Sequence, residues 1–236
     1  MMRNLWRVEV SESIGAAEKR WDAALLALCL GVVGTLYAYN RQPYSLVSWL
    51  DPSAPPVYRS HEEYLLVNCL MLLLPLIVLV SAGGALRTYN LSGGNRWGWM
   101  AAAACYLLML PLLWWASARA DFQQTYPLYR PARYAIPALL YHELTYTFYL
   151  WCWEMFFRAV LTSICWRWLG WMGIALQSLA FALLHIGKPM PEVAGSFVAG
   201  MALGGVAVRA QSFVPGFVCH ALVSATMDMF VLIRAR

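Results

Sequence analysis

Apolar stretches long enough to cross a lipid bilayer recur along almost the whole chain. A membrane-spanning helix needs about 20 mostly apolar residues. Only helices and closed barrels can cross, because the backbone finds no water to bond in the hydrocarbon core. The sequence contains such stretches at about 23–40, 62–84, 97–118, 134–166, 168–186, 191–209 and 212–233. It therefore predicts an all-α, polytopic transmembrane helix bundle.

The number of spans depends on the stretch at about 134–166, which is longer than a crossing requires. A straight helix of that length would measure about 48 Å at 1.5 Å per residue. It could tilt, break near Leu150, or begin as an interfacial segment around Tyr141. The prediction is therefore seven spans, or eight if the long stretch is divided.

Composition agrees with a membrane protein. The chain is 61% hydrophobic and 12% charged, whereas a soluble domain usually carries about 25% charged residues. The net charge of +5 comes largely from arginines scattered singly among the loops, which is unlike the basic stripe of a nucleic-acid-binding protein. We expect a multi-pass protein in contact with the lipid bilayer and no nucleic-acid partner. Lys and Arg are equally frequent in the two sets of alternating loops, so the positive-inside rule gives no orientation.

Ionisable residues lie within these apolar stretches, namely Glu154, Arg158, His185, His220 and Asp228. A charge at membrane depth costs at least about 2.5 kcal/mol on insertion scales, so it is usually retained for a function. Glu154 and Arg158 are four residues apart and share one helix face. A buried ion pair that only stabilises the bundle would explain those two equally well. The histidines on later spans favour a polar centre with a chemical function.

A carboxylate and two imidazoles suit hydrolysis in a dry site. Glu154 could take a proton from water and make it a nucleophile. One histidine would orient the water, and the other would donate a hydrogen bond to the oxyanion that forms when water attacks a peptide carbonyl. The same residue types form the His₂Glu set of catalytic zinc sites, so zinc is an alternative to a reaction without a cofactor. Cys219 adjoins His220, which leaves a thiol nucleophile as a minor alternative.

Three short motifs follow one another along the late spans. They are E-x-x-x-R at Glu154, F-x-x-x-H ending at His185, and H-x-x-x-polar from His220 to Ser224. Together, over about residues 134–233, they resemble the CAAX-protease and bacteriocin-processing family, the glutamic-type intramembrane proteases. The resemblance implies a membrane-embedded endopeptidase that cuts a membrane-anchored protein or peptide. We expect it in a bacterial inner membrane.

The resemblance also implies roles for the motif residues. Glu154 and His185 would activate water, and Arg158 would hold Glu154 in place. His220 and Ser224 would support the oxyanion. No metal ligand is implied.

The chain departs from the family pattern at two positions. Trp153 stands where the first motif often has the first of two glutamates, and Ser224 stands where the third often has asparagine. If the first glutamate is essential, the protein would be an inactive scaffold or regulator of the same fold. A proton-coupled transporter is a third interpretation, disfavoured because the chain is short and has no evident internal repeat.

Three further residues are assigned to the site. Asp228 shares a helix face with His220 and is predicted to orient it, with a polar group near the end of the span as the alternative. Glu143 precedes Glu154 by eleven residues and points in nearly the same direction on an unbroken helix, so it is a candidate for substrate access, although a position at the membrane interface is favoured. Lys188 lies in a Gly-Lys-Pro turn, where it could contact a lipid phosphate or a substrate terminus.

These observations divide the chain into three parts. Residues 1–22 mix acids and bases and lack the apolar core of a signal peptide, so they are predicted to form an interfacial segment. Residues 23–133 comprise N-terminal transmembrane helices and loops, and residues 134–236 form the core that resembles the protease family. Within that core, Ser196, Gly200 and Gly204 make a small-residue face that lets two helices approach closely.

Overall fold

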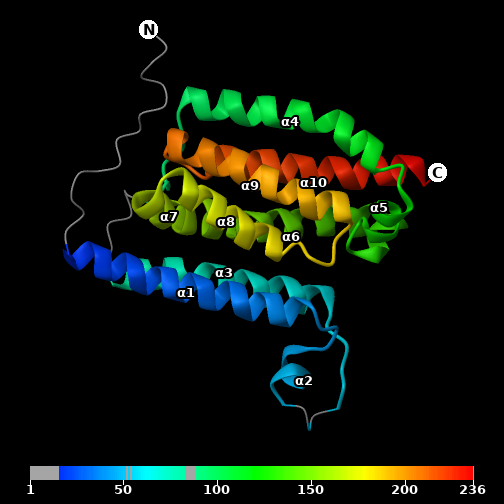
Figure 1. The fold of residues 1–236 in the computed structure, drawn as a ribbon. Helices are drawn as coiled ribbons and strands as arrows, with labels where there is room; N and C mark the ends of the chain where they lie inside the picture. Colours follow the sequence, from blue (N-terminus) through cyan, green and yellow to red (C-terminus); the bar gives the residue numbers. More distant parts are fainter. Residues whose placement is uncertain (1–15, 52, 54, 83–88, 236) are drawn as a thin grey trace.

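A computed structural model of the chain is a bundle of long helices that run side by side (Figure 1). It describes all residues except 1–15, 52, 54, 83–88 and 236. Five described helices are long and apolar enough to cross a membrane. They are α1 (Ala16–Asn40), α3 (His61–Ser81), α4 (Arg96–Ala116), α9 (Met190–Ala210) and α10 (Val214–Arg234). The described residues form no β-sheet, and the predicted all-α membrane bundle is confirmed.

The remaining apolar stretches form less regular helices. The long one is a continuous helical run of α6 (Ile136–Glu154), a π-helix η3 (Met155–Leu161) and α7 (Thr162–Leu169). Its irregular part is therefore η3, and the chain does not break near Leu150. The next helix, α8 (Trp171–Leu183), has 13 residues, fewer than a full crossing needs. The short helices α2 (Leu46–Leu50), α5 (Ala120–Thr125) and the 3₁₀-helix η2 (Arg130–Arg133) connect the long ones.

The first span starts earlier than predicted. Residues 1–15 of the expected interfacial segment lie outside the described residues, whereas residues 16–22 belong to α1. Asp22 explains the difference, because its carboxylate is fully buried and bonded to Arg167 Nη2 of α7 at 2.5 Å. The acid that marked a polar segment in the sequence is a packing partner inside the bundle.

The helices stack in layers that place the late segments in the middle. Figure 1 shows α1 and α3 on one side of the bundle and α4 on the opposite side, with α6, α8, α9 and α10 between them. Asn40 and Asn68 exchange amide hydrogen bonds of 2.9 and 3.0 Å that join α1 to α3. In turn α3 packs on α6 and η3, and α4 packs on α9 and α10. The segments that carry the ionisable residues are thus covered on both sides.

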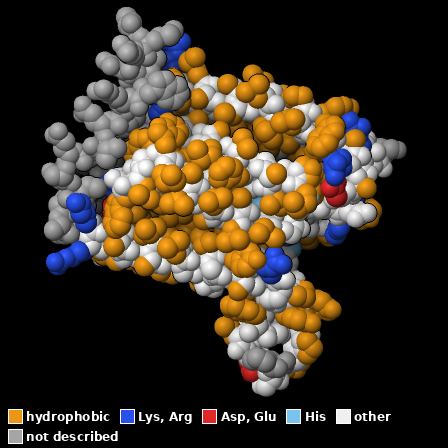
Figure 2. Space-filling model, viewed as in Figure 1, with side chains coloured by type: hydrophobic (Ala, Val, Ile, Leu, Met, Phe, Trp, Pro, Cys, Tyr) orange, Lys and Arg blue, Asp and Glu red, His pale blue; other side chains and the backbone are white. Residues whose placement is uncertain are grey.

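The outer surface matches a lipid environment. Figure 2 shows hydrophobic side chains over most of the visible face, with Lys and Arg near the ends of the bundle. The segment around α2 turns away from the helix axes at one end (Figure 1) and also exposes apolar side chains, among them Val47, Leu50 and Tyr58. The protein is accordingly a multi-pass membrane protein.

Small residues bring α8 and α9 together. A Cβ added at Gly200 would lie 2.8 Å from Ser178 Cβ, and one added at Gly204 would lie 2.9 Å from Ile174 Cγ2. Such distances are shorter than real side chains allow, so only glycine fits at this crossing. The predicted small-residue face of α9 is confirmed.

We expect Gly200→Ala to lower stability by about 1–3 kcal/mol, because the methyl group must push α8 away from α9. Gly195→Ala is the matched control on the same helix, since a Cβ there would meet nothing within 4 Å and alanine favours helix. Thermal unfolding of both variants in detergent measures the difference. Equal melting temperatures would contradict the proposed close contact.

Candidate active site

The junction of α6 and η3 buries an acid and a base together. Glu154 is the last residue of α6 and Arg158 lies in η3, and both side chains are 0% exposed. Arg158 Nε is 3.0 Å from Glu154 Oε2. A buried charge is strongly destabilising unless it is paired, so each residue requires the other. π-helical turns inside α-helices are frequently found at functional sites.

Arg158 also links η3 to α8 and, through Gln177, to α9. Its Nη1 donates a 2.7 Å hydrogen bond to Gln177 Oε1 on α8. Gln177 Nε2 in turn donates to the main-chain oxygen of Gly200 on α9 at 3.1 Å. Sequence analysis missed Gln177, although a buried amide within the apolar Trp171–Leu183 segment was a signal that could have revealed it.

Glu154 reaches His220 through its other carboxylate oxygen. His220 Nδ1 of α10 is 2.8 Å from Glu154 Oε1. A carboxylate oxygen accepts, so Nδ1 carries the proton and Nε2 is left for another partner. The imidazole is 19% exposed while Glu154 is 0% exposed. The Glu154 carboxylate therefore binds the Nδ1 side of the His220 imidazole, which as a whole is partly exposed.

His185 is held by the main chain of its own helix end. It follows α8 directly, and its Nδ1 is 2.8 Å from the main-chain oxygen of Phe181. That oxygen accepts, so in the neutral ring Nδ1 is protonated and Nε2 has a free lone pair. The ring of Trp153 meets the imidazole edge-on with centroids 5.6 Å apart. His185 thereby presents the unprotonated Nε2 of its neutral ring, with Nδ1 fixed by the main chain.

Phe181 links these groups. Its ring centroid is 4.6 Å from that of His185 and 6.0 Å from that of His220. The guanidinium of Arg158 lies over the same ring at 4.4 Å. The structure thus brings Glu154, Arg158 and His220 into direct contact and places His185 on the same aromatic ring. Among the described residues, no hydrogen bond joins His185 to Glu154.

Asp228 does not orient His220, contrary to the prediction. Its Oδ2 is 3.2 Å from His142 Nε2, both side chains are almost fully buried, and its Oδ1 has no partner among the described residues. The reason is helix direction. Because α10 runs antiparallel to α6, residues that follow His220 on α10 lie beside residues that precede Glu154 on α6. Asp228 therefore lies beside His142. Ser224, one turn after His220, is half-buried.

Glu143 belongs with the His142–Asp228 pair. Its carboxylate lies near Asp228, and its Oε1 is buried without a hydrogen-bond partner among the described residues. His61 of α3 lies near the same place, with its ring tilted against that of His142 and the centroids 5.4 Å apart. The chain therefore contains a second polar cluster, which sequence analysis divided between an access role and an orienting role.

Lys188 ties the α8–α9 turn to the loop before η2. Its Nζ donates to Tyr126 Oη at 2.9 Å and lies 3.7 Å from Glu192 Oε1. Burial alone would lower the pKa of Lys188, but Tyr126, Tyr146 and Glu192 raise this pKa well above its usual value. The ammonium therefore stays charged at neutral pH, with internal partners on the described part of the chain.

Residues 134–226 match the family of Rce1-like proteins, described as type II CAAX prenyl endopeptidase Rce1-like. This part of the chain is similar to that family. The predicted resemblance to the CAAX-protease and bacteriocin-processing family is confirmed. The matched range includes Glu154, His185, His220 and Ser224, and ends before Asp228. No curated protein and no solved structure matches the chain significantly.

The donor groups of the site do not form a metal-binding cluster among the described residues. Among the described residues, no three His, Cys, Asp or Glu side chains converge in a way that fits a metal ion. Both Glu154 oxygens face protein groups, one toward His220 and the other toward Arg158. We therefore derive no step through zinc.

Removing only the cation should be more damaging than removing both charges. We expect Arg158→Met to lower stability by about 3–5 kcal/mol, because it leaves the Glu154 carboxylate buried without its counter-ion. The double variant Glu154→Gln with Arg158→Met should regain a large part of that loss. Denaturant unfolding of both single variants and the double variant gives the coupling energy. Strictly additive losses would contradict the buried ion pair.

Proposed function

We propose that this protein is an intramembrane endopeptidase of a bacterial inner membrane, hydrolysing a peptide bond of a membrane-associated protein or peptide with water activated by its own side chains. The observation that carries the proposal is the Glu154 carboxylate, which contacts both Arg158 and His220 inside the bundle. These residues lie in the stretch similar to type II CAAX prenyl endopeptidases.

The geometry supports a division of labour between the two histidines. His185 Nε2 takes a proton from a water molecule, whose oxygen attacks the carbonyl carbon of the scissile bond. The carbonyl oxygen becomes an oxyanion and accepts a hydrogen bond from protonated His220 Nε2, with the Ser224 hydroxyl as a second donor. The carbon–nitrogen bond then breaks, and His185 passes its proton to the leaving amine. One water is consumed, and one acid and one amine are formed.

In this scheme Glu154 acts through His220 and does not take the proton of water itself. Both of its oxygens already face cationic or proton-donating groups at 2.8 and 3.0 Å. A carboxylate that binds Nδ1–H stabilises the imidazolium and fixes the ring with Nε2 facing outward, as in hydrolytic triads. This assigns Glu154 a positioning role, which differs from the direct water activation that the family resemblance implied.

The substrate we propose carries a prenyl group near its C-terminus. Support comes from the description of the matching family, whose members are called CAAX prenyl endopeptidases. The position of the histidines within the bundle favours a scissile bond close to a membrane anchor. A prenylated peptide ending in Cys-a-a-X is therefore the first substrate to try.

A second candidate function is a catalytically inactive scaffold, and Trp153 is the residue that favours it. Its side chain is almost fully buried and packs on Phe157, Phe181 and His185. It thus fills the flank of His185, and it stands where the family's first motif often has the first of two glutamates. A scaffold would need the fold and the ion pair but not the free nitrogens of the histidines.

Cleavage in proteoliposomes distinguishes the two functions. We expect purified protein to cleave a farnesylated peptide that ends in Cys-a-a-X, with products identified by mass spectrometry. His185→Ala and His220→Ala should each reduce the rate about 10²-fold or more, because each removes a proton-transfer or oxyanion group. Glu154→Gln should reduce it similarly, through loss of the charge that stabilises the His220 imidazolium.

Cys219→Ala is the matched control, since it alters the neighbour of His220 and should leave the rate within about threefold of wild type, as expected for a buried packing thiol. A folded Glu154→Gln variant that cleaves at the wild-type rate would contradict the mechanism. A wild-type protein that cleaves neither the prenylated nor the unprenylated peptide would favour the scaffold.

A further inference from the structure

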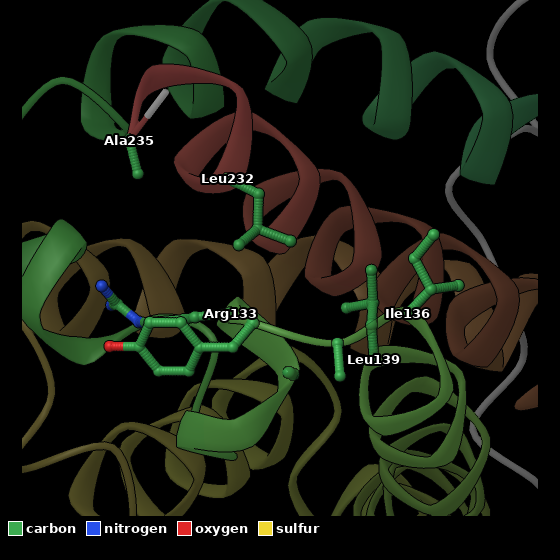
Figure 3. Close-up of a pocket in the computed structure, with 8 residues that line it drawn as sticks. Arg133, Ile136, Leu139, Leu232 and Ala235 are labelled. Atoms are coloured by element: carbon green, nitrogen blue, oxygen red, sulfur yellow. The ribbon is translucent and has the colours of Figure 1, made fainter.

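A pocket away from the histidines opens at one end of the bundle. It has a volume of about 380 Å³ and lies between the start of α6 and the end of α10. Figure 3 shows Leu232 of α10 and Ala235, the residue after that helix, on one side, with Arg133, Ile136 and Leu139 on the other. The volume falls within the range of small-molecule sites, roughly 300–1,000 Å³.

The position of the pocket is that of a membrane–water interface. It adjoins η2 and the first turn of α6, where the polar loop that carries α5 meets the apolar helix. Two of its lining residues are largely exposed, Tyr134 at 86% and Ile136 at 74%. Tyrosine is enriched at this depth of a bilayer, because its ring is apolar and its hydroxyl is polar.

The polar side of the pocket carries the guanidinium of Arg133, which forms no ion pair with any described residue. Arg133 Nη2 donates to the main-chain oxygens of Gln123 and Tyr126, and its Nε is buried without a hydrogen-bond partner in the described chain. No described carboxylate lies within ion-pair distance of Arg133. Two main-chain carbonyls orient this guanidinium but do not neutralise it.

Two other arginines at this end of the bundle also donate hydrogen bonds to neutral oxygen atoms. Arg130 of η2 donates to the main-chain oxygen of Gln124, and Arg234 of α10 donates to Ser117 Oγ at 2.9 Å. Neither forms an ion pair with a described carboxylate. By contrast, Arg119 nearby is paired with Asp121 at 3.0 Å. Counted over the described residues, the neighbourhood of the pocket therefore has an excess of positive charge.

The remaining walls are apolar. Ile136 and Leu139 contribute from α6 and Leu232 from α10. A ligand that fits must present an anionic group to Arg133 and hydrocarbon to the two helices. Phosphate is the anion that arginine binds with the most favourable geometry. The combination of a phosphate and an acyl chain is that of a glycerophospholipid.

We propose that this pocket binds an anionic glycerophospholipid, with its phosphate at Arg133 and the upper part of an acyl chain between α6 and α10. The lipid would neutralise the arginine and join the first turn of α6 to the last turns of α10. Because these two helices also carry Glu154 and His220, the bound lipid would stabilise the frame of the candidate active site without entering it.

Native mass spectrometry of the full-length protein, released from detergent with added lipid, tests the proposal. We expect wild-type protein to retain phosphatidylglycerol. Arg133→Gln should reduce retention about tenfold, consistent with loss of one charge-assisted hydrogen bond to phosphate. Leu232→Trp, which fills the pocket and leaves the charge in place, should reduce retention similarly. Arg119→Gln is the matched control, since it removes a charge from the same end but from a paired arginine, and should retain the lipid.

Four probes separate the sources of binding: phosphatidylglycerol, phosphatidylcholine, diacylglycerol and inorganic phosphate. We expect phosphatidylglycerol to raise the melting temperature of the wild type most. The proposal is overturned if diacylglycerol stabilises equally, because the arginine then plays no part, or if inorganic phosphate alone does so, because the apolar walls then play none. Equal stabilisation by phosphatidylcholine removes the proposed preference for anionic lipid. Loss of retention in Arg119→Gln equal to that in Arg133→Gln would show a general charge effect and would also overturn it.

Discussion

The buried carboxylate of Glu154 is the group on which the central part of this structure depends. It is fully enclosed, with Arg158 3.0 Å from one oxygen and His220 2.8 Å from the other. An isolated carboxylate at that depth would be strongly unfavourable, so α10 and η3 must both be in place for α6 to end where it does. The hydrogen bond from His220 that helps to stabilise the buried charge also fixes the orientation of the His220 ring. Stability and the proposed chemistry therefore share one set of interactions.

Close packing of α8 and α9 positions the remaining residues of the site, which lie on α8 or just beyond its end. Glycines at 200 and 204 let α9 approach α8, which brings Gln177 within reach of both Arg158 and the Gly200 carbonyl. Phe181 is one turn further along α8, where its ring contacts Arg158 and both histidines. The position of His185, just beyond the end of α8, thus depends on the close packing of α9 against α8 at Gly200 and Gly204. Similarity to type II CAAX prenyl endopeptidases extends over this same region.

Much of this arrangement could be predicted from the sequence, and the exceptions have physical causes. Apolar stretches identify helices well, because a bilayer leaves the backbone few alternatives. The start of α1 was missed, since Asp22 looks polar in sequence, but its carboxylate is buried and has a partner, Arg167, on α7. Helix-face arguments correctly grouped Glu154 with Arg158, but they linked Asp228 to His220 when its partner is His142. Spacing describes one helix face, whereas the register between antiparallel helices is set by tertiary packing.

The tautomer of His220 tests the central claim most directly. The chain has four histidines, so nitrogen-15 NMR of histidine-labelled protein in lipid nanodiscs can resolve and assign each ring. If Glu154 holds His220 as described, the neutral ring will carry its proton on Nδ1, and Glu154→Leu will shift that signal while His185 stays bound to its carbonyl. A neutral His220 ring that carries its proton on Nε2 and none on Nδ1, with a spectrum unchanged by the Glu154 substitution, would contradict the account.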